Sequence, residues 1–432
     1  MADLEKEVTA LQAEITSLKD ADTPAMKTAA YVEPVTTPVA APADDAAKIS
    51  LASLLGPVTL SGFGDVYYGY NYNHPGDNES GFRFFDGPTN GFGFNMAELI
   101  LDKAPDTTSS ESRLGYHVAA GYGQAANIVN GSDTFGDGSN FYLKEAYFDY
   151  LFPVGKGLTL TVGKFVTPIG AEVIETNANW NYSRGLLFYY AIPYFHFGAS
   201  AKYAFNSKWA LTGYLVNGWN NTFIDKYDGE GTSSGLTYGA SLAWTPNAKW
   251  SITENYFAGP VVDGYGEETP TIITDWKQLT DTVISYTPNS KWSFMLNGDY
   301  GFGPRYTDCF EDDAVTRQAL PPGCEASQAV NWWGVAGYAK YTWTPKTNFA
   351  VRYEFYNDTD GYSGLLFGDD GHAQEVSADW SYNLTSALLI RGEYRYDFAG
   401  EPIFLNGTDR FVKEQNTATL GFIYSFSSAN AK

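Results

Sequence analysis

From residue 58 onward, hydrophobic and polar side chains alternate along most segments of the chain. Val66, Tyr68 and Tyr70 fall on one face of an early segment, while Asp65 and Asn71 fall on the other. Later segments place charged residues on the polar face in the same way: Lys202; Arg352 and Glu354; Arg391, Glu393, Arg395 and Asp397. A period of two residues predicts β-strands with one apolar face and one wet face. Alternation alone does not separate a membrane barrel from a soluble sandwich.

Short turns of one kind recur between these segments. Each has an aromatic residue, then a turn rich in Pro, Asn, Lys or Ser, then an apolar residue that starts the next alternating run. The turn residues are Pro153, Asn206, Pro246, Pro288, Pro345 and Asn383, and a seventh turn lies at residues 104–112. Their spacing is too uneven for a blade or solenoid repeat, and each interval has room for two membrane-crossing strands and a long loop. Seven turns, with both chain ends on the turn side, predict an all-β, sixteen-stranded antiparallel transmembrane barrel over residues 58–426.

Composition favours the barrel and excludes two other classes of protein. Aromatic residues make up 16% of the chain, with 32 Tyr and 28 Phe, and there are 44 Gly. No run approaches the roughly 18 apolar residues of a membrane helix. The formal net charge of -23 excludes a face that could neutralise nucleic-acid phosphates. Most acidic groups lie between the strands, where they either keep exposed loops soluble or concentrate cations at a channel mouth.

The N-terminal residues follow a different pattern. Apolar residues recur there at alternating steps of four and three, as in a coiled coil: Leu4, Val8, Leu11, Ile15 and Leu18. We assign residues 1–23 to a coiled-coil oligomerisation helix, 24–57 to a Pro/Ala-rich linker and 427–432 to a C-terminal tail. The helix either associates with identical partners or packs on the protein's own body. No signal peptide is visible, so we interpret the chain as a mature or recombinant form.

Two features of the predicted outer loops carry candidate chemistry. Cys309 and Cys324 lie in one loop, and we expect a disulfide between them and hence an oxidising compartment. Asn357, Asp358 and Asp360 offer oxygen ligands for Ca²⁺ at short spacing, without a complete EF-hand pattern. Such runs are usually solvated turns. Ca²⁺ is therefore a weak candidate, and we expect no other cofactor.

One segment carries a resemblance to a known family. Residues 155–199, GKGLTLTVGKFVTPIGAEVIETNANWNYSRGLLFYYAIPYFHFGA, together with the Tyr-Thr-Pro turns, resemble the bacterial outer-membrane porins of the OmpL-like porin-2 group. The resemblance spans residues 58–426 and is most specific over residues 163–193. It implies a sixteen-stranded outer-membrane porin. The chain departs from the family pattern in its N-terminal coil and in the six residues that follow Phe426.

By the strand count, this segment contains the third long loop, which is unusually apolar. The loop residues that need burial are Ile169, Val173, Ile174, Trp180, Leu186, Leu187, Phe188 and Tyr189. The only protein surface available to an outer loop is inside the lumen, so we expect the third loop to fold inward. The resemblance to sixteen-stranded porins implies the same arrangement.

An inward loop predicts a pore constriction with opposed charges. Glu172 and Glu175 of the loop would face the water path, and wall residues Arg352, Arg391 and Arg395 would lie opposite. The other candidates are Arg184 in the loop and Arg113, Lys202, Lys340, Glu354 and Glu393 on the lumen wall. Acid and base across a narrow opening would create a transverse field. In the alternative, the wall arginines neutralise neighbouring wall acids across strands, the two loop glutamates form a solvated edge, and Arg184 pairs with one of them.

Together these features predict an outer-membrane porin, and not an enzyme, for passive diffusion of small hydrophilic solutes and ions with a weak cation preference. We expect contact with outer-membrane lipid and lipopolysaccharide, a homotrimer, and an N-terminal segment in the periplasm. A structural alternative tethers the barrel to the cell wall through the N-terminal coil. An outer-membrane hydrolase is the third hypothesis. Its only lumen-facing histidines, His117 and His196, fall on predicted strands three and six, with no nucleophile motif near either.

Overall fold

The computed structural model describes residues 58–109, 112–130, 140–224, 233–265, 272–304, 329–358, 362 and 371–430. The predicted coiled coil, the whole of the predicted linker, Cys309, Cys324 and Asp360 lie outside these residues. Among the described residues, no helix has both the length and the apolar character needed to cross a membrane.

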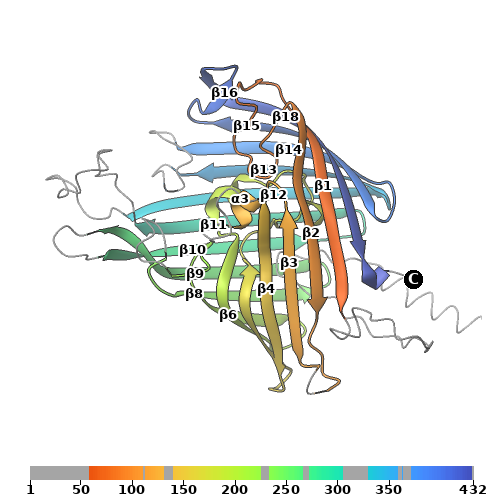
Figure 1. Cartoon of the computed structure of the whole chain (residues 1–432), viewed down its shortest axis with the longest axis vertical. Helices are drawn as coiled ribbons and strands as arrows, with labels where there is room; N and C mark the ends of the chain where they lie inside the picture. Colours follow the sequence, from red (N-terminus) through yellow and green to blue (C-terminus); the bar gives the residue numbers. More distant parts are fainter. Residues whose placement is uncertain are drawn as a thin grey trace, which may run out of the picture.

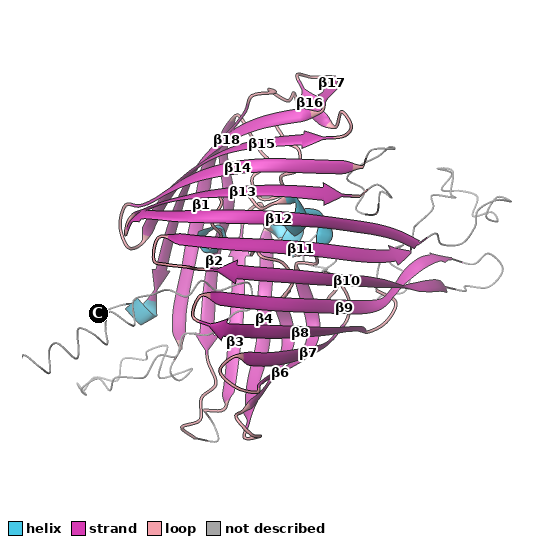
Figure 2. Ribbon diagram, turned by 180° about the vertical axis from the view of Figure 1, so that it is seen from behind, coloured by secondary structure: helices cyan, strands magenta, loops and turns pink. Residues whose placement is uncertain are grey.

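Sixteen antiparallel strands close into a barrel, in which the first strand pairs with the last, as the alternation and turn count predicted (Figure 1). The strands are β1 Thr59–Asn71, β2 Gly91–Lys103, β3 Leu114–Tyr122, β4 Phe141–Phe152, β5 Leu158–Val166, β6 Phe195–Ala204, β7 Trp209–Val216, β8 Thr237–Asn247, β9 Trp250–Tyr265, β10 Ile272–Tyr286, β11 Trp292–Pro304, β12 Ala329–Thr344, β13 Thr347–Asn357, β14 His372–Asn383, β15 Leu388–Ala399 and β18 Glu414–Ser427. Figure 2 shows β9 to β14 running side by side along one wall. Each of the seven predicted turns joins two neighbouring strands.

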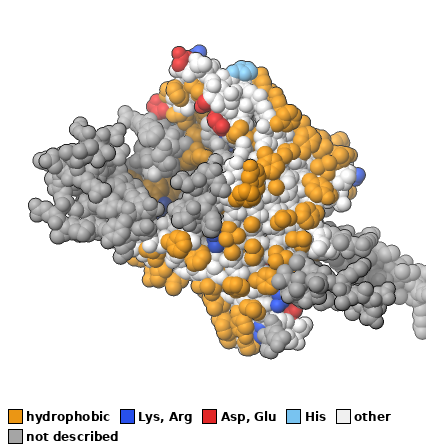
Figure 3. Space-filling view, viewed as in Figure 1, with side chains coloured by type: hydrophobic (Ala, Val, Ile, Leu, Met, Phe, Trp, Pro, Cys, Tyr) orange, Lys and Arg blue, Asp and Glu red, His pale blue; other side chains and the backbone are white. Residues whose placement is uncertain are grey.

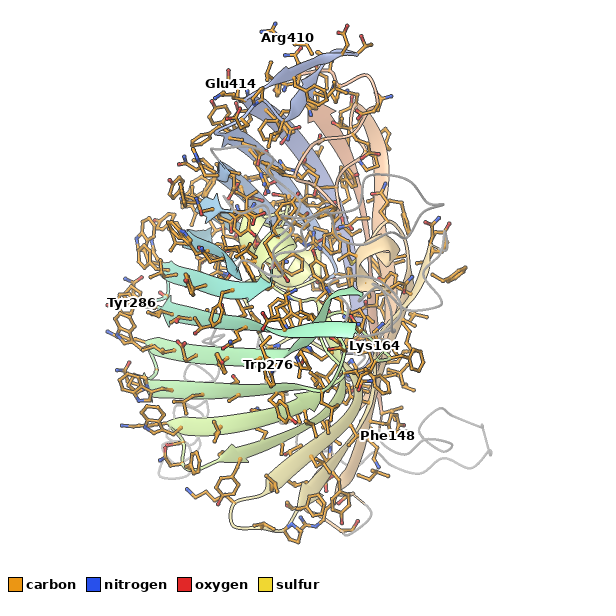
Figure 4. The ribbon with its side chains drawn as sticks, turned by 90° about the vertical axis from the view of Figure 1, so that its left-hand side faces the viewer. Phe148, Lys164, Trp276, Tyr286, Arg410 and Glu414 are labelled. Carbon is orange, nitrogen blue, oxygen red and sulfur yellow. The ribbon has the colours of Figure 1, made fainter. Side chains whose placement is uncertain are left out.

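Short elements lie in the connections between strands. They are α3 Ala126–Val129, the 3₁₀ turns η1 Thr176–Ala178 and η3 Ser428–Asn430, the π-helical turn η2 Leu187–Ala191, and the hairpin of β16 Phe404–Asn406 and β17 Arg410–Val412. The β16–β17 hairpin was not predicted, because each of its strands is only three residues long. Arg410 and Glu414 mark this region at one edge of the molecule in Figure 4.

The outward face of the wall is apolar and aromatic. Hydrophobic side chains spread over the visible wall (Figure 3), and Phe148 and Tyr286 point away from the barrel on opposite sides (Figure 4). Near the turns, aromatic rings contact each other across neighbouring strands: Trp209 with Trp244, Trp250 with Tyr286, and Trp292 with Tyr341. A belt of aromatic rings at the edge of an apolar band is typical of membrane barrels.

The segment between β5 and β6, residues 167–194, supplies much of the buried core and is called L3 below. Leu186, Leu187 and Tyr182 are almost fully buried, although a barrel wall has no second sheet to cover them. They are buried because L3 folds into the lumen, as its apolar content predicted. The turn η2 packs against β11 and β12 from inside.

Candidate functional site

L3 crosses the lumen from one wall to the opposite one. Near its start, the Asn255 side chain of β9 donates to the Pro168 carbonyl at 3.1 Å, and the Ala171 N–H donates to Asn297 Oδ1 of β11 at 2.9 Å. Further along, Thr176 Oγ1 donates to Asp65 Oδ2 of β1 at 2.6 Å. β1 and β9 are eight positions apart in a ring of sixteen strands. The loop is therefore held at diametrically opposite points of the barrel.

Two β-bulges aim polar side chains at L3. Asn95 is the extra residue between β2 and β1, and its amide donates to Asp65 at 2.6 Å and to Thr176 at 3.0 Å. Lys144 is the extra residue between β4 and β3, and its ammonium binds Glu98 at 2.7 Å and Glu175 of the loop. A bulge turns a side chain to the other face of the strand.

The sequence interpretation placed Asp65 on the polar face of its strand but missed Asn95, Glu98 and Lys144. A usable signal was nevertheless present, because the consecutive polar pair Lys144 and Glu145 interrupts the two-residue alternation of β4. Both side chains are buried, which strict alternation would not allow.

On β13, β14 and β15, buried acidic and basic side chains form alternating layers, called the charge ladder below. The strand register sets side by side Glu354, Glu375 and Asp397, then Arg352, Ser377 and Arg395, then Asp379 and Glu393, then Ser381 and Arg391. All of these side chains are buried. Within the ladder, Arg352 Nε binds Glu375 at 2.6 Å, and Arg395 Nε binds Asp397 at 2.7 Å.

The basic layers of the ladder bind backbone carbonyls of L3. Arg391 Nη1 donates to the Thr176 carbonyl at 2.8 Å and to the Asn181 carbonyl at 3.0 Å. Arg395 Nη1 donates to the Arg184 carbonyl at 2.6 Å. A loop without regular secondary structure lacks backbone hydrogen bonds for these carbonyls, and a buried carbonyl needs a donor. The wall arginines supply it.

The acidic layers bind the backbone N–H groups of the same loop. Glu393 Oε2 accepts from Tyr182 at 3.0 Å and from Ser183 at 3.1 Å, and Glu354 accepts from Leu186. L3 and Glu354 are so close at this contact that position 185 has no room for a side chain. A Cβ atom added to Gly185 would lie 2.1 Å from both carboxylate oxygens of Glu354.

Glu172 and Arg352 are in direct contact. Arg352 Nη1 lies 2.5 Å from Glu172 Oε1, and both side chains are almost fully buried. The other Glu172 oxygen accepts from the Gly185 N–H at 2.6 Å. The expected open gap between loop acid and wall base is therefore wrong for this pair. The reason is that residue alternation indicates which face of a strand a side chain lies on, and not how far that side chain is from the loop.

The other loop candidates also have specific partners. Arg184 donates to the carbonyls of Tyr182 and Ile174, and its guanidinium lies 4.4 Å from the centre of the Phe85 ring. The alternative in which Arg184 pairs with a loop glutamate is not the arrangement found. Glu175 instead binds Lys144 and keeps about a fifth of its side chain exposed, 22%.

Of the remaining wall candidates, Arg113 and Lys202 lie apart from the ladder, whereas Lys340 of β12 pairs with Ala350, the register partner of Asp379. Arg113 donates to the Leu151 carbonyl at the turn end of β4, at 3.1 Å. Lys202 is exposed on the inward face of β6. Lys340 Nζ lies 4.8 Å from the ring centre of Trp180 in L3. Of the Ca²⁺ candidates, Asp358 accepts from the Tyr362 N–H at 2.7 Å, which is a turn contact.

The two lumen-side histidines have separate partners. His117 Nδ1 hydrogen-bonds Asp102 at 2.8 Å, and His117 also lies 3.3 Å from Glu145. His196 Nδ1 donates to the Gly218 carbonyl at 2.9 Å, and its Nε2 hydrogen-bonds Thr167 at 3.1 Å. Each ring is thus fixed by its own strand neighbours.

The first long loop, residues 72–90, adds a second inward contact that the sequence interpretation missed. Arg83 lies 3.3 Å from Asp86 and 3.4 Å from Asp397 at the end of the ladder. Burial raises the pKa of Asp86, and the Arg83 guanidinium opposes that rise. Tyr189 of L3 donates to Asp86 at 3.5 Å, so the two loops meet in the lumen.

Comparison with protein families gives one match over most of the chain. The family model described as "Putative beta-barrel porin-2, OmpL-like" matches residues 57–426. No curated protein matches the chain.

Solved structures with the same fold include three outer-membrane proteins. The outer membrane channel DcaP of Acinetobacter baumannii is 14% identical, with a TM-score of 0.53 over 85% of this chain and 97% of that one. An anion-selective porin from Comamonas acidovorans is 12% identical, with a TM-score of 0.52 over 86% and 99%. OmpT of Vibrio cholerae in its trimer form is 12% identical, with a TM-score of 0.51 over 86% and 99%. At these identities the likeness concerns the fold.

Proposed function

The chain belongs to the OmpL-like porin-2 family of β-barrel porins, and from this premise we propose that it forms a water-filled channel for passive diffusion of small hydrophilic solutes and ions. Family and fold point to the bacterial outer membrane and to a channel without enzymatic activity. A sixteen-stranded barrel is wide enough for an aqueous lumen. The open questions are which solutes pass through the lumen and along which part of its wall.

The observation that carries the proposal is the uneven exposure of the lumen wall. Where L3 contacts the ladder, the charged side chains are buried. On β5 to β7, by contrast, the inward-facing Thr161, Ser200 and Thr212 are half-exposed, and Lys202 is exposed. We place the passage between L3 and this hydroxyl-lined wall.

In this proposal L3 narrows the lumen, and the predicted constriction residues take different parts. Glu172, Arg184, Arg352, Arg391 and Arg395 hold the loop in place, since all five are buried in its contacts. Glu175, with its partly exposed carboxylate, borders the passage. The edge of the aqueous passage is then set by L3, which the ladder holds in place, and not by the ladder itself.

A weak cation preference is part of the proposal. It is supported by the net charge of -23, because a negative surface concentrates cations at the channel mouth. The arginines beside the buried acids of the ladder offset part of the contribution of those acids to this field. Lys202 on the exposed wall opposes the preference, which keeps it small.

We also propose a homotrimer embedded in outer-membrane lipid. The OmpT structure of similar fold is described in a trimer form, and the apolar outward wall suits either lipid or a neighbouring barrel. The disulfide between Cys309 and Cys324 and the N-terminal coil remain predictions.

The function is tested by single-channel recording of the purified, folded protein in planar bilayers under a salt gradient. We expect discrete open-channel steps and a small reversal potential of the sign that favours cations. Heat-denatured protein is the control for conductance that does not need the barrel. Folded protein without open-channel steps would refute the channel, and a reversal potential favouring anions would refute only the selectivity.

A further inference from the structure

Two aspartates face each other on the wall where L3 begins. Asp281 of β10 and Asp299 of β11 are direct partners in the strand register, on neighbouring strands that Figure 2 shows side by side. Their exposed fractions are 0% and 3%. Like charges directly opposite each other on a sheet destabilise it, and burial from water increases that cost.

No basic side chain compensates this pair in the part of the chain that the structure describes. The ion pairs found among the described lumen residues involve other carboxylates, those of the ladder, L3, β2 and β4. The two carboxyl groups are within hydrogen-bonding contact of each other, and the groups that donate to them are neutral amides, including the Gly170 N–H. Asn255 and Asn297 each donate to Asp281 at 2.6 Å, and Asn297 donates to Asp299 at the longer distance of 3.3 Å.

Two buried oxygen atoms of this cluster lack a hydrogen-bond partner. They are Asp299 Oδ2 and Asn255 Oδ1. The Asn255 amide reaches the cluster through Nδ2, which lies 2.6 Å from Asp281 and 3.1 Å from the Pro168 carbonyl. A half-turn of the amide would exchange the two atoms and bring the unpartnered Oδ1 to the place that Nδ2 occupies. An unpaired carboxylate oxygen taken out of water is costly unless a cation or proton compensates it.

We propose that Asp281, Asp299, the Asn255 side-chain oxygen and the Pro168 carbonyl form a Ca²⁺ site that ties the start of L3 to the wall. All of the donors are oxygens, which are the ligands of hard cations, and a divalent ion neutralises both carboxylates. Ca²⁺ fits a buried site better than Mg²⁺, which gives up its water reluctantly. Binding requires the Asn255 amide to turn, an orientation that the hydrogen-bond network decides.

The site would act on L3 through two neighbouring contacts. Pro168 belongs to the loop, and Asn297 accepts from the Ala171 N–H at 2.9 Å. A bound ion would therefore fix the first turn of the loop, just as the ladder fixes its later part. This role is independent of which solute passes through the channel.

Calorimetric titration of CaCl₂ into the folded, EDTA-treated protein in detergent tests the site. We expect one bound Ca²⁺ that is lost in Asp299→Asn. Asp149→Asn is the matched control, since Asp149 is a wall carboxylate with its own donor, Thr161, at 2.5 Å. Ca²⁺ held by acidic outer loops would persist in both variants. Binding that is equal in wild type and Asp299→Asn, or absent from wild type, would overturn the proposal.

Thermal unfolding separates the metal site from a carboxyl pair that shares a proton. At constant pH, Ca²⁺ should raise the unfolding temperature of wild type and not that of Asp299→Asn, because a ligand that binds only the folded state stabilises it. In EDTA, Asp299→Asn should unfold at or above the wild-type temperature, since one of two opposed charges is gone. If Ca²⁺ does not change the unfolding temperature of wild type but that temperature rises as the pH falls, the two carboxyls share a proton, and the metal site is overturned.

Discussion

Two walls of the same lumen hold buried carboxylates in different ways. On β13 to β15, the ladder acids lie beside Arg352, Arg391 and Arg395, and both kinds of layer bind the backbone of L3. On β9 to β11, Asp281 and Asp299 contact each other and accept from amides, and L3 is held there through Asn255 and Asn297.

The comparison shows what the arginines do. On the first wall they satisfy the carbonyls of an irregular loop and also compensate the neighbouring acids. On the second wall the amides satisfy the loop, but they cannot cancel two negative charges. The ladder acids therefore have arginines of the chain beside them, whereas the aspartate pair requires an added cation or proton.

Arg352→Ala should have the largest effect, because it makes the first wall resemble the second. Glu172 and Glu375 would each lose a charged partner at 2.5 and 2.6 Å while staying buried. Breaking a buried pair in this way costs about 3–5 kcal/mol. The measurement is the urea or heat midpoint of barrel unfolding, followed by gel mobility. Arg113→Ala, outside the ladder, is the control and should shift the midpoint far less. Equal shifts would show that the ladder is not special.

Gly185→Ala should have the next largest effect, since it opens the contact between loop and ladder without changing a charge. The new methyl would lie 2.1 Å from the Glu354 carboxylate. Overpacking of this kind costs about 1–3 kcal/mol. Gly298→Ala on the second wall is the matched control, because a Cβ there meets nothing within 4 Å. Protease sensitivity of L3 reports the difference, and a Gly298→Ala variant that is cleaved as readily would contradict the account.

Glu172→Gln tests the comparison in another way, because it places an amide against the first wall, like the amides of the second. The amide can still accept from Gly185, while Arg352 retains Glu375. We expect a loss of about 1–2 kcal/mol, in the range of one hydrogen bond to a charged group. Glu175→Gln, at a partly exposed site, should cost less in the same unfolding assay. A larger loss for Glu175→Gln would reverse the assignment of which glutamate holds the loop.

Trp250 lies on the outward face, so Trp250→Ala should leave both lumen walls unchanged. Its ring stacks on Tyr286 with centroids 4.2 Å apart. We expect a loss of about 0.5–1.5 kcal/mol from the aromatic pair and slower insertion into vesicles. The single-channel conductance should stay at the wild-type value. A changed conductance would mean that the outer belt and L3 are coupled.

The turn count predicted the strand number, and residue alternation predicted the inward face of Arg352, Arg391 and Arg395, because turns and a two-residue period depend on nearby residues alone. The apolar content of L3 predicted that it folds inward. The sequence could not predict that Asp281 faces Asp299, or that Glu354, Glu375 and Asp397 form one layer, since strand register depends on the whole closed barrel. The two bulges that aim Asn95 and Lys144 at the loop break the alternation on which the prediction relied.

The most direct test of the account compares the single-channel conductance of wild type with that of Arg391→Gln/Arg395→Gln. These arginines donate to L3 carbonyls at Thr176, Asn181 and Arg184. If the ladder holds L3 across the lumen, wild type gives steady open-channel steps, and the folded double variant gives larger, fluctuating ones. Steps of equal size and steadiness in the two proteins would contradict the claim that the ladder fixes the loop that narrows the channel.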